Sequence, residues 1–135
     1  NVVKTGEVST ALAMKVCHTI LYAQIQNGVN EMLLYASKNG LYIDDIITAL
    51  GNSPASNTFL AENGKKIANS DFKVKTKIKD VHKQLDFAHD FTFDNKIPMK
   101  GLELTKSLYD SALDRKLASH DITELYTVVE RASHS

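Results

Sequence analysis

The chain has 135 residues, a length typical of one domain, and its 16 basic and 16 acidic side chains give a formal net charge of zero. This balance excludes a global basic field, so neither nucleic acid nor a membrane surface is expected as a partner. The single cysteine, Cys17, excludes an intrachain disulfide and fits a reducing, cytoplasmic location. Because Cys17 lies in an apolar stretch, we expect it to be a small buried side chain.

The first predicted element is a long helix that Ser9 or Thr10 can cap and that ends near Lys38. Its apolar positions recur at helical spacing, and a lysine followed by Gly40 is a typical helix stop. Strain is expected near Asn27-Gly28. The apolar run at its start covers about 15 residues and holds a charge, whereas a membrane-spanning helix needs about 20 apolar residues.

Lys15 is the only formally charged side chain between Glu7 and Glu31. An ammonium in such an apolar stretch either meets an anion or loses its proton, because burying it unpaired costs several kcal/mol. The alternative is that its stem covers apolar surface while its charged head stays in water. The local pattern leaves both interpretations open.

Shorter helices are predicted over residues 42–50, 56–68, 78–91 and 98–116, with a loop at residues 92–95. A last helix begins at Asp121, where Glu124 completes a capping box. Residues 72–79 alternate apolar and cationic side chains, which is typical of a strand. No second strand-like run could pair with them, so we predict an extended segment that enters a helix. The expected fold is an all-α bundle of about six helices.

Seven lysines lie close together, opposed in that region by Asp71 and Asp80. They form either a wall that binds a carboxylate or a nucleotide phosphate, or a solvated rim. The seven are Lys65, Lys66, Lys73, Lys75, Lys77, Lys79 and Lys83.

Other chemistry finds little support in the sequence. His82 and His89 are two helical turns apart, without an acidic pair that would complete a cage, so no metal site is predicted. Cys17 has only His18 beside it, on another side of the helix, and no Gly-x-Ser-x-Gly motif is present. The six glycines never form Gly-x-Gly, which argues against a phosphate-binding loop within this chain.

The segment Gly6-Glu7-Val8-Ser9-Thr10-Ala11-Leu12-Ala13-Met14-Lys15-Val16-Cys17-His18-Thr19 resembles Gly-x-Val-Gly-x-Gly-x-x-x-Lys-x-x-Asn-Asn of the β-hydroxyacid dehydrogenases. This family includes 3-hydroxyisobutyrate dehydrogenase and tartronate semialdehyde reductase. Further blocks follow in the family's order: Asn30-Glu31 with Ala36, Asn39-Gly40-Leu41 and Asp45-Ile46-Ile47; Phe72 with Lys79-Asp80; and Ile97-Pro98, Tyr109 and His120-Asp121. The resemblance covers essentially the whole chain and implies the helical C-terminal domain of a 6-phosphogluconate dehydrogenase-like protein.

The resemblance implies that residues 1–135 cover the substrate and build a homodimer or tetramer, while an N-terminal Rossmann domain, absent from this chain, binds NAD or NADP. The reaction would interconvert a short 3-hydroxy acid and its semialdehyde or oxo acid. By its place in the motif, Lys15 would be the catalytic lysine that handles the proton of the substrate hydroxyl. Lys79 would lie at the cofactor, and the implied substrate-binding residues are Ser9, Thr10, Ala11, Thr19, Phe72 and Asp80.

The chain departs from the family pattern at several positions. Ser9 and Ala11 replace two glycines, His18 and Thr19 replace the Asn pair, and Val81 replaces a leucine. Two hypotheses therefore stand: a domain of an NAD(P)-dependent oxidoreductase, inactive in isolation, or a non-catalytic helical dimerisation module with a decayed site. In both, the apolar surface of the long helix is expected to mediate self-association.

Overall fold

The regular structure is helical throughout the part of the chain that a computed structural model describes, residues 7–94 and 96–133. The elements are α1 (Glu7–Lys38), α2 (Ile43–Gly51), α3 (Thr58–Ala68), α4 (Ile78–Asp94), α5 (Lys100–Asp114), the 3-10 turn η1 (Ile122–Glu124) and α6 (Leu125–Ala132). These described residues contain no β-strand, which confirms the all-α prediction. None of their helices has the length and apolar content that crossing a membrane requires.

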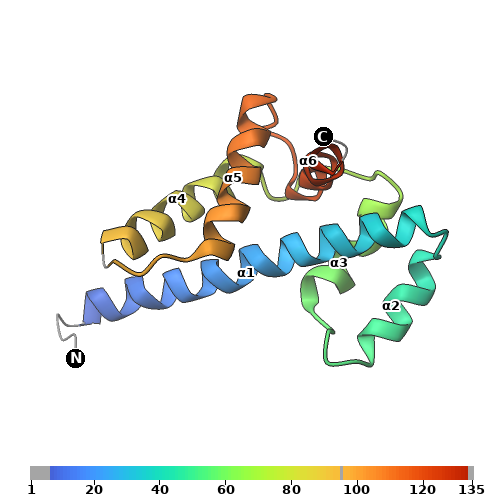
Figure 1. The fold of residues 1–135 in the computed structure, drawn as a ribbon, viewed down its shortest axis with the longest axis horizontal. Coiled ribbons are helices and arrows are strands. Elements are labelled where there is room, and N and C mark those ends of the chain that lie inside the picture. Colours follow the sequence, from blue (N-terminus) through green and yellow to red (C-terminus); the bar gives the residue numbers. More distant parts are fainter. Residues whose placement is uncertain (1–6, 95, 134–135) are drawn as a thin grey trace.

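Helix α1 is the axis on which the other helices pack (Figure 1). Helix α4 lies beside its first half, α5 meets it near the middle, and α3 and α6 pack along its second half. Helix α2 reaches the bundle mainly through α3. Helices α4 and α5 pack on one side of the first half of α1, so its other side stays uncovered.

Two helix ends follow the chemistry that the sequence indicates. Asn57 caps α3, since its Oδ1 accepts a hydrogen bond from the Leu60 N–H at 2.8 Å. Gly40 has a φ of 69°, and beyond it the Leu41 N–H reaches back to the Ala36 carbonyl at 3.0 Å. This left-handed turn ends α1, because a side chain at Gly40 would strain the backbone.

The start of α1 differs from the prediction. The helix begins at Glu7, so Ser9 and Thr10 lie inside its first turn and do not cap it. It also continues without interruption past Asn27 and Gly28, where strain was expected. A single glycine costs a helix only about 1 kcal/mol, which the packing of a helix this long outweighs.

The lysine-rich segment before α4 is extended and makes one isolated antiparallel bridge, between Lys77 and Asp121. The first two N–H groups of α4 donate to carbonyls on the other side of this contact. Ile78 bonds to His120 and Lys79 to Ala118, both at 2.9 Å. The start of α4 is thus satisfied by backbone acceptors rather than by a capping side chain.

Two local predictions are wrong. Helix α4 extends through Asp94, and buried Thr92 lies within it, so residues 92–94 are not a loop, while Asn95 is outside the described residues. The capping box at Asp121 does not form either. The Glu124 carboxylate instead bonds to the His120 ring at 2.9 Å, and Asp121 accepts from Thr123 and from the segment before α4.

The core lies where α1, α4, α5 and α6 converge. Its fully buried members include Ile78, Leu85, Leu102, Tyr109 and Leu125. The hydroxyl of Tyr109 donates to Oε1 of buried Gln26, which links α5 to the middle of α1. Burial raises the pKa of Tyr109 far above its ordinary range, so this phenol stays protonated in the folded chain.

Candidate functional site

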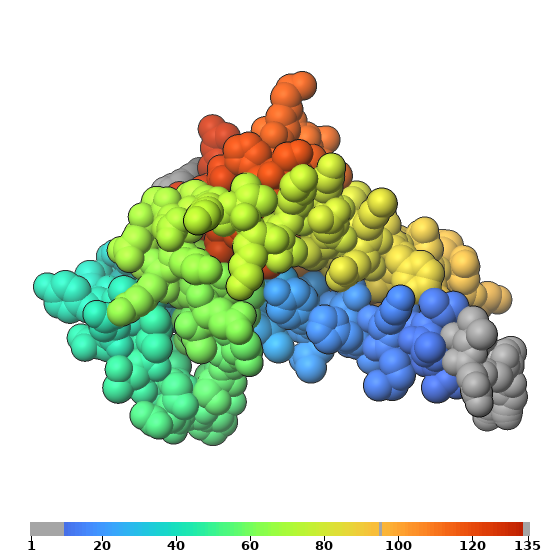
Figure 2. All heavy atoms as spheres, turned by 180° about the vertical axis from the view of Figure 1, so that it is seen from behind, coloured from blue at the N-terminus to red at the C-terminus, as the bar shows by residue number. Residues whose placement is uncertain are grey.

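Lys15 and Thr19 lie one turn apart on α1 and line a pocket of about 460 Å³. The opposite wall comes from the middle of α4, which lies along the first half of α1 on the face shown in Figure 2. The residues that line the pocket are Leu12, Lys15, His18, Thr19, Lys83, Gln84 and Phe87. The volume is within the range of small-molecule sites in proteins, about 300–1,000 Å³.

The chain on its own leaves Lys15 exposed. This exposure fits the second of the two interpretations drawn from the sequence, in which the head of the side chain stays in water. Within the described residues no carboxylate forms an ion pair with Lys15. Thr19, one turn further along α1, is buried. The ring of His18 stacks on Tyr22, with ring centroids 5.4 Å apart.

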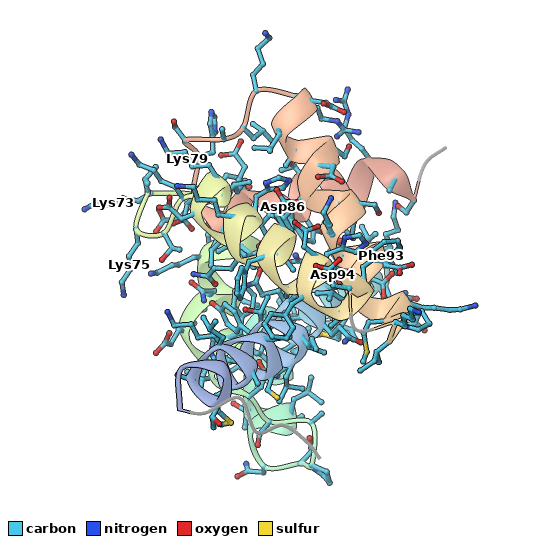
Figure 3. The ribbon with its side chains drawn as sticks, turned by 90° about the vertical axis from the view of Figure 1, so that its left-hand side faces the viewer. Lys73, Lys75, Lys79, Asp86, Phe93 and Asp94 are labelled. Carbon is cyan, nitrogen blue, oxygen red and sulfur yellow. The ribbon has the colours of Figure 1, made fainter. Side chains whose placement is uncertain are left out.

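Lys79 and Asp80 lie in the first turn of α4, both exposed and outside the pocket lining. Asp80 precedes Gln84 by one helical turn, so it shares the face of α4 that the pocket uses. Lys73 and Lys75 stand on the extended segment before the helix and, with Lys79, point away from the body of the molecule (Figure 3).

The structure does not bring Phe72 to Lys15. Phe72 lines a different pocket, beside the second half of α1, with Leu33 and Tyr126. Thr10 and Ala11 are exposed at the start of α1 and are not among the lining residues. Ser9 is part of α1, but its side chain lies outside the described residues.

Lys83 and Gln84 are pocket residues that the sequence did not single out as a site. Helical periodicity places them beside the apolar face of α4 formed by Val81, Leu85 and Ala88. It could not tell which other helix they would meet. The only signal was the membership of Lys83 in the lysine cluster. Of the other lysines in that cluster, Lys65 forms an exposed ion pair with Asp44 at 3.1 Å.

A second charged cluster joins α4 to α5. His82, Asp86 and Asp110 offer three ligand atoms within 4.8 Å of one another, a geometry that could hold a metal ion. The ammonium of Lys106 lies there instead, 3.3 Å from Asp86 and 3.2 Å from Asp110. A cation of the chain itself thus balances the carboxylates. The spacing of four residues between His82 and Asp86 is the signal in the sequence that could have indicated this cluster.

The prediction that Cys17 is buried is wrong, since Cys17 is exposed. It belongs to a stripe at helical spacing formed by Met14, Cys17 and Leu21, which we call the α1 stripe. Met14 and Leu21 are each 64% exposed. Val16 and Ala23, on the other side of the helix, are buried. The cysteine is exposed because α4 and α5 cover only one side of this half of α1.

The comparisons with known proteins concern the family and the fold of the chain. A family profile described as the NAD-binding of NADP-dependent 3-hydroxyisobutyrate dehydrogenase matches residues 9–129. A crystal structure of 3-hydroxyisobutyrate dehydrogenase from Salmonella typhimurium superimposes with a TM-score of 0.79 at 13% sequence identity. The match covers 86% of this chain and 41% of that one, so the chain spans about two-fifths of that enzyme. A search of curated proteins gave no match.

The profile match covers most of the chain, including Lys15, the pocket and the contact between α4 and Asp121. The structural likeness, at its low identity, concerns the fold alone, and it agrees with the profile. The chain therefore belongs to the family described as the NAD-binding of NADP-dependent 3-hydroxyisobutyrate dehydrogenase.

Proposed function

We propose that this chain is the substrate-covering domain of an NAD(P)-dependent oxidoreductase that interconverts a short 3-hydroxy acid and its semialdehyde or oxo acid. Lys15 is the catalytic residue in this proposal. The observation that supports it best is the pocket in which Lys15 and buried Thr19 are neighbours. A small hydroxy acid fits its volume, and the ammonium offers both a charge and a transferable proton.

The chemistry assigned to Lys15 follows from its place in the lining of this pocket. In the oxidation direction its neutral amine accepts the hydroxyl proton, and in reduction its ammonium returns the proton to the carbonyl oxygen. NAD or NADP would supply the hydride acceptor or donor. A domain that closes over the pocket would displace water from Lys15 and strengthen its interaction with a developing alkoxide.

The cofactor would be held mainly outside this chain. Within the described residues there is no strand from which a dinucleotide-binding unit could be built. The chain would contribute Lys79, which is exposed at the start of α4 beside the pocket-facing side of the helix. Asp80 and Thr19 complete the residues that we assign to the substrate side, with Ser9, Thr10 and Ala11 at the open end of α1.

A second candidate is a non-catalytic dimerisation module, and the α1 stripe favours it. Met14 and Leu21 expose most of their apolar surface, and Tyr35 near the other end of α1 is 68% exposed. Large exposed apolar side chains on one helix are typical of a surface that another chain covers. Self-association is also compatible with the enzyme, so it does not by itself exclude catalysis.

An activity assay separates the two candidates. We expect the full-length protein to oxidise short 3-hydroxy acids with NAD or NADP, while residues 1–135 alone show no turnover. Formation of NADH or NADPH at 340 nm is the measurement. A full-length protein that binds the dinucleotide but oxidises none of the short 3-hydroxy acids tested would favour the non-catalytic module. Turnover by residues 1–135 alone would refute the assignment of the cofactor to another domain.

A further inference from the structure

The pocket between α1 and α4 has a charge that its own chain does not balance. Two of its lining residues, Lys15 and Lys83, carry ammonium groups, and none of the described lining residues carries a carboxylate. Neither lysine takes part in the ion pairs found among the described residues. Two cations on one pocket repel each other, and covering the pocket would increase that repulsion. An anionic ligand removes this cost.

Nearby acids are committed elsewhere or lie outside the pocket. Asp86 on α4 is held by Lys106 at 3.3 Å and lies 3.6 Å from the His82 ring. Asp80 shares the pocket-facing side of α4, but it is exposed one turn before Gln84 and beyond the lining residues, so water and salt screen its charge. On α1, none of the residues three and four positions from Lys15 carries a carboxylate. The charge of the pocket therefore remains available to a ligand.

The hydrogen-bond donors form two groups on opposite walls. Lys15 and Thr19 offer an ammonium and a hydroxyl on α1, and Lys83 and Gln84 offer an ammonium and an amide on α4. Leu12 and Phe87 add apolar surface to the lining. A ligand that bonds to the donors of both walls has a short carbon chain. It carries one anionic group that Lys83 and Gln84 can bind, in addition to the groups that Lys15 contacts.

We propose that the substrate of this site is a hydroxy acid with a second carboxylate, and that Lys83 and Gln84 bind that second carboxylate. The proposal rests on the proposed function only for the hydroxyl group. A carboxylate is favoured over a phosphate because the lining residues belong to the interiors of α1 and α4. Their backbone N–H groups are used within the helices, whereas phosphate sites commonly employ free N–H groups at helix starts or in loops.

Binding of a non-reactive pair of acids tests this without turnover. Succinate and butyrate have the same number of carbons, and only succinate has a second carboxylate. Isothermal titration of the full-length protein at neutral pH should give a dissociation constant for succinate at least about tenfold lower than for butyrate. Equal affinities would overturn the proposal.

Two variants show where the difference arises. Lys83→Met should bring succinate to within about twofold of butyrate, while leaving butyrate affinity unchanged. Lys38→Met is the matched control, since Lys38 is an exposed lysine like Lys83 but lies on α1, about 35 Å along that helix from Lys15. It should retain the wild-type preference. If Lys83→Met weakens both acids equally, or weakens NAD(P) binding instead, Lys83 does not bind a second carboxylate.

Two further arms separate the alternatives. 3-Phosphonopropionate, which replaces one carboxylate of succinate with a phosphonate, should bind no more than about threefold more tightly than succinate, and a gain of about tenfold would overturn the choice of carboxylate. Activity assays are read separately. A Lys83-dependent preference for succinate without any oxidation of hydroxy acids would support the pocket and refute the oxidoreductase. Oxidation of monocarboxylic hydroxy acids without a Lys83-dependent preference for succinate would support the oxidoreductase and refute the binding of a second carboxylate.

Discussion

The carboxylate of Asp121 accepts a hydrogen bond from the backbone N–H of Lys75 at 2.7 Å. It also accepts one from the next N–H, that of Thr76, at 2.9 Å. The buried acid thereby fixes the extended segment that leads into α4, and with it the starting position of the helix that forms one wall of the pocket. The lysines of this segment are thus carried on a backbone that is held in place.

Asp121→Asn should lower the free energy of unfolding by about 1–3 kcal/mol at pH 7, because a neutral amide is a weaker acceptor for several buried N–H groups. Burial alone would raise the pKa of Asp121, but hydrogen bonds from Thr123 and from the backbone of Thr76 and Lys75 lower it below its ordinary value. A carboxyl whose pKa is lowered by folding stabilises the protein above its unfolded pKa of about 3.9. This stabilisation is lost as the pH falls through the folded pKa.

Urea unfolding at pH 7 and at pH 3 measures this effect. The difference between wild type and Asp121→Asn should shrink at pH 3. Asp114→Asn, at an exposed position at the end of α5, should change stability by no more than about 0.5 kcal/mol at either pH. An equal stability of wild type and Asp121→Asn at pH 7 would show that Asp121 does not hold the segment.

Tyr109→Phe should destabilise the fold by about 1–2 kcal/mol, although it removes only one oxygen atom. The lost hydroxyl is the donor to Oε1 of Gln26, which is fully buried and would be left without this partner. Tyr35→Phe is the matched control, because Tyr35 is 68% exposed. Thermal and urea unfolding give the comparison, and an equal effect of the two substitutions would argue against an energetically important link between α1 and α5.

The sequence predicted the helices well where the chemistry of their ends is local. Asn57 and Gly40 act within a few residues of themselves, so their roles could be read without knowing the fold. The role of Asp121 could not be predicted in this way, because its carboxylate accepts hydrogen bonds from Lys75 and Thr76, which are far away in the chain. The capping box predicted for Glu124 does not form, because its carboxylate bonds to the His120 ring instead.

The candidate site shows the same division. Lys15 and Thr19 are four residues apart, so helical spacing places them on one face of α1, and both line the pocket. That Lys83 and Gln84 form the opposite wall depends on how α1 and α4 pair, and periodicity within one helix does not contain this information. The exposure of Cys17 has the same origin, since an apolar stretch does not reveal which of its sides a neighbouring helix will cover.

Self-association should depend on the α1 stripe. Val29 is buried in the core of its own chain and Ile25 is half-buried. A charge at either position would therefore disturb the fold as well as any contact with a second chain. Leu21→Lys is the better variant, since Leu21 is 64% exposed. Sedimentation equilibrium at micromolar concentration should show a dimer or larger for wild type and at least about a tenfold weaker association for the variant.

Leu104→Lys on α5 is the matched control, because Leu104 is 54% exposed and lies outside the α1 stripe. It should associate as wild type does. A wild-type protein that stays monomeric at high concentration would contradict the dimerisation of this helix and, with it, the non-catalytic dimerisation module. Equal weakening by both substitutions would mean that the contact is not made through α1.

The most direct test of the account is the turnover of the full-length protein with Lys15→Ala. Loss of a positioned acid–base group should lower kcat by about a hundredfold or more, while the affinity for NAD or NADP stays nearly unchanged. Lys15→Arg should remain almost as slow, because a guanidinium keeps the charge but does not exchange its proton. Lys38→Ala should turn over as wild type does. A loss of less than about threefold in Lys15→Ala would contradict the catalytic role of Lys15.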